Sequence, residues 1–247
     1  MKRYKLIVAY DGTNYSGWQL QDNAPTIEGV LNEALTRLLR QPIQVTGASR
    51  TDAGVHACGN VAVFDAETTI PGERLKYALN PLLPKDVRVM ESSEAAKDFH
   101  PRFCDTEKTY EYRILNTPDP LPMMRLYTYW YSRPLDVEKM DQAAKLIPGK
   151  RDFKSFCAAG AQVSTTVRRV TDAKVWREGN TVIIRIKGEG FLYNMVRIIA
   201  GTLIRIGEGK WQPEEMTEII KSCDRTKAGP TAPPFGLTLM EIKYKDS

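Results

Sequence analysis

The chain repeats one order of elements, strand, helix, strand, strand, helix, strand, in each of its halves. In the first half, hydrophobic periodicity predicts strands at 4–10, 44–46, 61–64 and from 87, with helices at 26–40 and 71–79. In the second half it predicts strands at 109–115, at 237–244 and as a pair around 178–180, with helices at 136–147 and from 191, and additions at 127–131 and 213–222. This order is the split β-α-β pattern. The sequence therefore predicts an α+β fold with two ferredoxin-like units, residues 1–104 and 105–247, whose mixed, mostly antiparallel sheets form a central cleft.

Composition excludes several classes of protein. No apolar run approaches the roughly 18 residues of a membrane span, and the first residues lead straight into a strand pattern, so we expect a cytoplasmic protein with no membrane partner. The 4 cysteines are scattered and only 2 histidines could join them, so we expect reduced thiols, no metal and no cofactor. The net charge of +5 favours a polyanionic partner such as nucleic acid, although only weakly.

A loop of small and polar residues at 47–57 carries Asp52, which we interpret as the catalytic residue. A carboxylate on a connection flanked by Gly47 and Gly54 can project into a cleft, and functional groups concentrate on loops held by a rigid scaffold. An aspartate among Ser, Thr and Gly more often makes a turn or a helix N-cap, and residue type alone favours that alternative.

The segment 190–206 has apolar residues around most of a helix, which predicts a largely buried helix. Its polar stripe includes Arg197, with Gly201 on the same face. A mid-helix glycine indicates that another backbone or a ligand approaches closely. A buried guanidinium needs a carboxylate partner, for which Asp52 is the candidate and any other carboxylate an equally favoured one.

Two further signals remain open at the level of residue type. Tyr110 lies on a predicted strand as either a core tyrosine or a ring that stacks on a base, and the two interpretations are evenly balanced.

The basic pairs 150–151 and 168–169 are more often solvated faces than phosphate clamps. Gly188 and Gly190 do not complete the Gly-x-Gly-x-x-Gly motif of dinucleotide-binding proteins, because Tyr193 occupies the position of the third glycine. Ser49 is not surrounded by the nucleophile-elbow motif of serine hydrolases.

Six segments, in this order along the chain, resemble the TruA-type tRNA pseudouridine synthases. They are 11–19, 49–56 (Ser-Arg-Thr-Asp-Ala-Gly-Val-His), 99–103 (Phe-His-Pro-Arg-Phe), 108–110, 191–197 (Phe-Leu-Tyr-Asn-Met-Val-Arg) and 229–233 (Gly-Pro-Thr-Ala-Pro). The match spans almost the whole chain, which makes the resemblance far more specific than a single motif.

The resemblance implies an isomerase of tRNA processing that converts uridine to pseudouridine at positions 38, 39 and 40 of the anticodon stem-loop. It also implies a homodimer that binds RNA without cofactor or metal. On the same ground Asp52 is the essential carboxylate and Tyr110 packs on the target base. Arg50 helps to hold the nucleotide out of the helix, and Arg197 pairs with the catalytic carboxylate.

Two other classes of function stay as alternatives. A non-catalytic RNA-binding module is favoured less, because such modules display aromatic residues on a central strand whereas 190–193 opens a predicted helix. A hydrolase of N-glycosidic bonds would release free uracil. The resemblance also leaves three routes for the aspartate: attack on C1′, addition to the base, or removal of a sugar proton to give a glycal.

Overall fold

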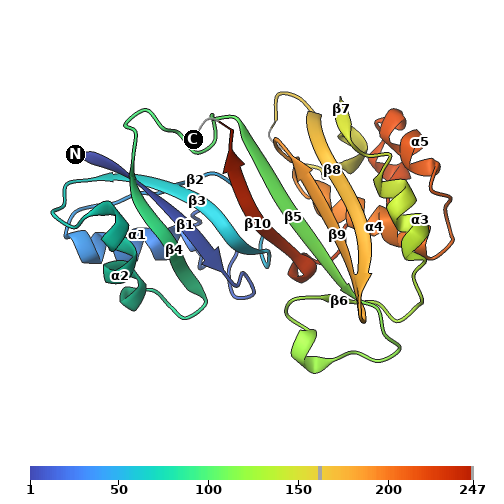
Figure 1. The fold of residues 1–247 in the computed structure, drawn as a ribbon, viewed down its shortest axis with the longest axis horizontal. Helices are drawn as coiled ribbons and strands as arrows, with labels where there is room; N and C mark the ends of the chain where they lie inside the picture. The colour runs from blue at the N-terminus through green and yellow to red at the C-terminus, as the bar shows by residue number, and fades with distance from the viewer. Residues whose placement is uncertain (161–162, 246–247) are drawn as a thin grey trace. The chain divides into compact units, whose positions relative to one another are not determined.

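The computed structural model describes residues 1–160 and 163–245, and it divides into two compact units (Figure 1). Unit 1 is Met1–Asp105 together with the chain from Leu239 onward, and unit 2 is Thr106–Thr238. Most of the final strand thus groups with unit 1, where it lies beside a strand of the first half. The fold is α+β, as predicted. A division into functional domains at residues 104 and 105 stays a prediction.

Unit 1 is built on four neighbouring strands with the order β4-β1-β3-β10. Their bounds are β1 Lys2–Tyr10, β3 His56–Ala66, β4 Val87–Ala95 and β10 Leu237–Tyr244, and the short β2 Thr46–Gly47 pairs with β3. Strand β1 runs antiparallel to both β3 and β4. Its alternate residues are buried from Tyr4 to Tyr10, which confirms the predicted period of two.

Two helices complete unit 1 and contact each other, α1 Ile27–Leu39 and α2 Leu75–Leu79 (Figure 1). Helix α1 begins where the sequence predicts, because the Thr26 side chain caps it by accepting a hydrogen bond from the Gly29 N–H at 3.2 Å. Its buried residues fall at helical spacing and include Leu31 and Leu35.

Unit 2 contains the strand order β5-β9-β8-β7. The bounds are β5 Thr106–Leu115, β7 Gly149–Asp152, β8 Val167–Glu178 and β9 Thr181–Gly188, which pair antiparallel, and β6 Tyr129–Trp130, which pairs parallel with β5. The predicted strand pair around 178–180 is the β8–β9 hairpin, where Gly179 takes a φ of 55°.

The helices of unit 2 are α3 Val137–Ala144, α4 Met195–Gly207 and α5 Glu215–Ser222. Helix α4 is buried around most of its circumference, as predicted, but the expected start at Phe191 is wrong. Asn194 precedes the helix in the left-handed conformation with a φ of 60°, so the helix begins only at Met195.

In the described residues, six short 3-10 turns connect these elements. They are η1 Gly72–Arg74, η2 Asn80–Leu82, η3 Pro122–Met124, η4 Lys154–Phe156, η5 Arg225–Lys227 and η6 Pro234–Gly236. Across residues 1–160 and 163–245, no helix combines the length and the apolar character that crossing a membrane requires.

Gly201 permits a close contact between α4 and the segment that follows α5. A Cβ atom on Gly201 would lie 1.8 Å from the carbonyl oxygen of Pro230. The contact is reinforced where the Gly229 N–H donates to Thr202 Oγ1 at 2.9 Å. The sequence prediction that another backbone approaches this glycine is therefore confirmed.

Gly201→Ala should destabilise the protein, although alanine normally improves a helix interior by about 1 kcal/mol. We expect the free energy of unfolding in urea to fall by about 1–3 kcal/mol, because the methyl group must displace a backbone carbonyl. Gly29→Ala in α1 is the matched control, since its new Cβ would meet side-chain atoms and no backbone carbonyl, namely the capping Thr26 Oγ1 at 3.1 Å and Leu20 Cδ1 at 3.2 Å. Equal stabilities of the two variants would contradict the close contact.

Candidate active site

Asp52 lies on a tight turn between β2 and β3. The Val55 N–H donates to the Asp52 carbonyl at 3.1 Å, and Gly54 takes a φ of 76° that suits glycine. The Asp52 side chain is half-buried between buried Thr51 and exposed Ala53. The backbone of Asp52 thus forms a turn, as expected for an aspartate among Ser, Thr and Gly residues. The Asp52 side chain extends from this turn.

A buried amide anchors the backbone just before Asp52. Asn60 on β3 is fully buried, and its Oδ1 accepts from the Ser49 N–H at 3.2 Å while its Nδ2 donates to the Ser49 carbonyl at 2.9 Å. The same Nδ2 lies 3.2 Å from the Tyr10 hydroxyl, which in turn is 2.7 Å from Thr51 Oγ1. Residues on both sides of Arg50 are therefore tied to the strands of unit 1.

The loop 11–19 packs against the same turn. A Cβ on Gly12 would lie 2.1 Å from the Val55 carbonyl oxygen, and one on Gly17 would lie 2.6 Å from that of Thr51. The Trp18 N–H donates to the Thr51 carbonyl at 3.0 Å, and its ring is fully buried against Gly47. Among the described residues, Trp18 Nε1 has no hydrogen-bond partner. Trp18 is accordingly part of the core beneath the Asp52 turn.

Two arginines lie beside the turn. Arg50 is exposed, and its Nη1 lies 3.4 Å from Gln19 Oε1. Arg102 Nε donates to the Gly47 carbonyl at 2.6 Å. Burial and, after it, the charge of Arg50 lower the pKa of the Arg102 guanidinium. Sequence reasoning gave no role to Arg102, although its segment was one of those that carry the resemblance.

Tyr110 in unit 2 fits both of the interpretations that its sequence left open. It is 7% exposed on β5, where it lies opposite Ile186 of β9. Its ring meets that of Phe191 edge to face, with centroids 5.2 Å apart. Burial favours the core tyrosine, whereas a ring fixed by Phe191 would also serve as a rigid stacking platform.

Arg197 lies in the first turn of α4 and is half-buried rather than fully buried. Its Nε donates to the Ala232 carbonyl at 2.7 Å, and its Nη1 donates to Asn194 Oδ1 at 2.7 Å. The backbone is tied in return, because the Ala232 N–H donates to the Arg197 carbonyl at 3.1 Å. These bonds fix the guanidinium against the segment 230–233, which sequence analysis did not anticipate.

The predicted site residues thus fall into two groups. Arg50 and Asp52 share one turn of unit 1, and Tyr110 and Arg197 lie on β5 and α4 of unit 2. The pairing of Asp52 with Arg197 joins the two groups and stays a prediction. Within the described part of the chain, no cluster of three or more His, Cys, Asp or Glu side chains could hold a metal ion.

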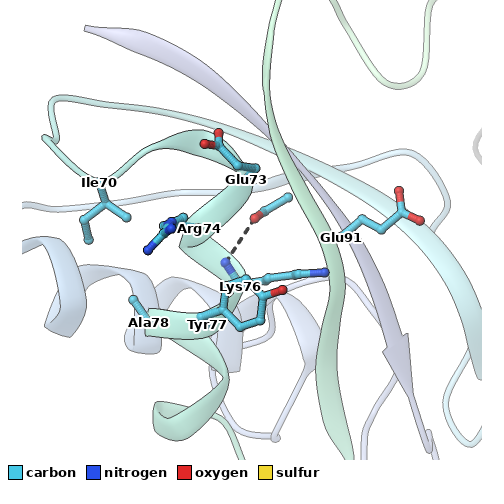
Figure 2. A pocket seen from close by; sticks show the side chains of 8 residues that line it. Ile70, Glu73, Arg74, Lys76, Tyr77, Ala78 and Glu91 are labelled. Carbon is cyan, nitrogen blue, oxygen red and sulfur yellow. Dashed lines mark hydrogen bonds between the residues drawn. The ribbon is translucent and has the colours of Figure 1, made fainter.

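Figure 2 shows a groove on unit 1 that contains none of the predicted site residues. Its lining comes from the chain just before η1 and from η1, α2 and β4, and it consists of Ile70, Glu73, Arg74, Lys76, Tyr77, Ala78, Glu91 and Ser92. The Lys76 N–H donates to Ser92 Oγ at 3.0 Å, and the ammonium group of Lys76 lies 5.1 Å from the centre of the Tyr77 ring. Both acids and bases line the groove, which gives it no clear preference for an anion.

Comparison with known proteins places this geometry in a family. The sequence profile described as tRNA pseudouridine synthase matches residues 6–104 and 143–245. A tRNA pseudouridine synthase A of Syntrophomonas wolfei is 45% identical over 246 residues, which span 100% of this chain and 99% of the relative. A tRNA pseudouridine synthase A 2 of Clostridium perfringens and a tRNA pseudouridine synthase A of Ruminiclostridium cellulolyticum are each 46% identical, across 99% of this chain and 100% of the relative.

The chain is therefore a member of a class of RNA-modifying isomerases. It belongs to the tRNA pseudouridine synthase family, whose members isomerise uridine to pseudouridine in tRNA. The TruA-type resemblance seen in the sequence is confirmed.

Asn60→Ala should weaken both the fold and the activity, because it removes the amide that anchors Ser49. We expect the free energy of unfolding to fall by about 1–3 kcal/mol and the kcat for pseudouridine formation, measured by tritium release, to fall with it. Asn80→Ala is the matched control, because Asn80 bonds the Val89 N–H and carbonyl at 2.8 and 2.9 Å away from the turn. It should lose stability and keep kcat. An Asn60→Ala enzyme with an unchanged kcat would show that the anchored turn is not needed for catalysis.

Proposed function

We propose that this enzyme isomerises uridine to pseudouridine at positions 38, 39 and 40 of the tRNA anticodon stem-loop, with Asp52 as the catalytic carboxylate. The turn anchored by Asn60 supports this proposal most directly, because it holds Asp52 on a rigid part of unit 1. We further propose that the enzyme acts as a homodimer, as the TruA-type resemblance implies, and that it acts in the cytoplasm, as its sequence predicts.

The reaction breaks the C1′–N1 glycosidic bond, turns the uracil and joins C5 to C1′. C5 gives up its proton and N1 gains one, so the product is an isomer and no oxidant or reductant is consumed. A carboxylate can act as nucleophile or base only when it is ionised. Asp52 therefore has to be deprotonated whichever of the three routes it follows.

Arg197 is the proposed partner that keeps Asp52 ionised. An opposite charge within about 4–6 Å favours the charged form of a carboxylate. The bonds of Arg197 to Ala232 and Asn194 support this role, because they hold the guanidinium in one orientation. They also explain why a half-buried arginine would not turn to the solvent.

Tyr110 and Arg50 are proposed to handle the base. The target atoms of a paired uridine are inside the helix, so the nucleotide has to be flipped out at a cost of a few kcal/mol. Arg50 is exposed at the turn and can fill the vacated space. Tyr110, held edge to face by Phe191, can stack on the uracil and accept the C5 proton directly or through water.

Asp52→Asn should abolish isomerisation and largely preserve tRNA binding, because the amide keeps the shape of the side chain and loses the nucleophile and base. Tritium release from labelled tRNA measures turnover, and filter binding measures affinity. Asp22→Asn, at an exposed position in a loop, is the matched control and should turn over normally. Appreciable turnover by Asp52→Asn would contradict the assignment.

Analysis of the products after incubation with uridine-labelled tRNA separates the alternative functions. Pseudouridine in the product supports the isomerase. Free uracil would instead show a hydrolase, and unchanged tRNA with intact binding would show a non-catalytic RNA-binding module.

Arg197→Ala should lose activity and stability together. The lost hydrogen bonds to Ala232 and Asn194 predict a decrease of about 1–3 kcal/mol in the free energy of unfolding. Arg205→Ala is the matched control on the same helix, since Arg205 pairs with Glu208 at 3.2 Å. It should lose stability and retain activity, whereas an Arg197→Ala variant with an unchanged melting temperature would argue against a fixed guanidinium.

A further inference from the structure

Strands β7 and β8 place arginines directly opposite each other at the edge of unit 2. Arg151 pairs with Arg168, and Lys150 pairs with Arg169. Residues opposite each other in an antiparallel pair have side chains on the same face, and neighbours along a strand alternate between faces. The four cations therefore form two pairs on opposite faces of the sheet.

The register assigns the Arg151–Arg168 pair to the face that carries Tyr110. Val170 lies opposite Gly188, and Gly188 lies opposite Lys108, two residues before Tyr110. Arg168, two residues before Val170, therefore shares that face. Lys150 and Arg169 belong to the other face.

The Arg151–Arg168 pair lies close to the aromatic contact at Tyr110. Arg168 Cδ is 3.9 Å from the position that a Cβ on Gly190 would occupy. The next residue is Phe191, whose ring meets that of Tyr110 at 5.2 Å. If one base of an RNA strand stacked on Tyr110, the neighbouring backbone of that strand would lie near Arg151 and Arg168.

The two pairs differ in how their charges are balanced. Arg169 Nε lies 3.8 Å from a carboxylate oxygen of Glu189. Among the described residues, neither Arg151 nor Arg168 has a carboxylate oxygen within 4.0 Å. Like charges directly opposite each other destabilise a strand pair, so an anion bound at this face would relieve the repulsion.

Arg168 is also held in place and partly shielded from water. Its Nη1 donates to the carbonyls of Thr165 at 2.9 Å and Val167 at 2.7 Å. Burial lowers the pKa of its guanidinium, which means that the charged form is poorly solvated. An anion that replaced the missing solvation would bind favourably.

We propose that Arg151 and Arg168 bind the phosphate backbone of the RNA strand that carries the target uridine, each at its own phosphate, because Arg151 lies over Gly149 while Arg168 turns to the carbonyls of Thr165 and Val167. The proposal rests on the proposed function, because that function brings an RNA strand to Tyr110. Guanidinium groups suit a phosphate because their planar N–H donors match its oxygens in pairs. The sequence favoured a solvated face for both basic clusters, and this pair is the exception.

The test compares Arg151→Gln and Arg168→Gln with wild type in filter binding of an unmodified tRNA transcript across a series of salt concentrations. Each variant should bind more weakly, and the slope of log K against log salt should become shallower by about 0.7–0.9, the value for one lost phosphate contact. The double variant should make the slope shallower than either single variant does, because each arginine contacts its own phosphate.

Lys150→Gln and Arg169→Gln are the matched controls, because they remove the same charges from the same strands on the other face. They should leave the slope unchanged. Arg151→Gln should melt no lower than wild type, since it relieves a like-charge pair, and a lower melting temperature would indicate a structural role instead. Wild-type slopes for both Arg151→Gln and Arg168→Gln would overturn the proposal.

Tritium release by the same preparations separates this proposal from the function on which it rests. An active wild type together with unchanged slopes in the arginine variants would overturn the phosphate site alone. Shallower slopes together with a wild type that forms no pseudouridine would support the phosphate site and overturn the isomerase assignment.

Discussion

The buried side-chain amide of Asn60 fixes the backbone that leads to Asp52. Asn60 bonds both backbone groups of Ser49 from the middle of β3, so the residues before Asp52 cannot move independently of the sheet. Buried polar groups of this kind are costly when unpaired and rigid when satisfied. Glycines at 12, 17 and 47 then let the neighbouring loop and Trp18 pack against the same turn. These contacts fix the backbone that carries Asp52.

In unit 2, a close backbone contact at a glycine likewise holds a charged side chain in place. Gly201 lets the segment around Pro230 lie against α4, and Ala232 from that segment accepts a hydrogen bond from Arg197. A close backbone contact thus fixes a charged side chain whose own helix position would leave it free to turn. Both proposed partners of the ion pair are held by backbone contacts that glycine makes possible, which is consistent with chemistry that requires fixed positions.

Periodicity predicted most of the fold, because the signal is local. Alternation in β1, the helix that follows Thr26 and the close approach at Gly201 were all confirmed. The start of α4 was predicted wrongly, because the apolar pattern continues back to Phe191 across Asn194, whose residue type adopts the left-handed conformation more readily than most.

The site was less predictable from the residues themselves. Residue type favoured a turn-making Asp52, and only the family resemblance assigned it a catalytic role. Asn60 was missed because a single amide in an apolar strand does not reveal its partners 11 residues away. The roles of Arg50, Asp52, Tyr110 and Arg197 remain proposals.

The central claim is that the Asp52 carboxylate and the Arg197 guanidinium form an ion pair. A double-mutant cycle measures it directly, using the free energies of urea unfolding of wild type, Asp52→Asn, Arg197→Ala and the double variant. The cycle cancels the bonds that Arg197 makes to Ala232 and Asn194 and leaves the interaction between the two side chains. We predict a favourable coupling energy of about 0.5–3 kcal/mol. Additive effects, within about 0.3–0.5 kcal/mol, would contradict the ion pair.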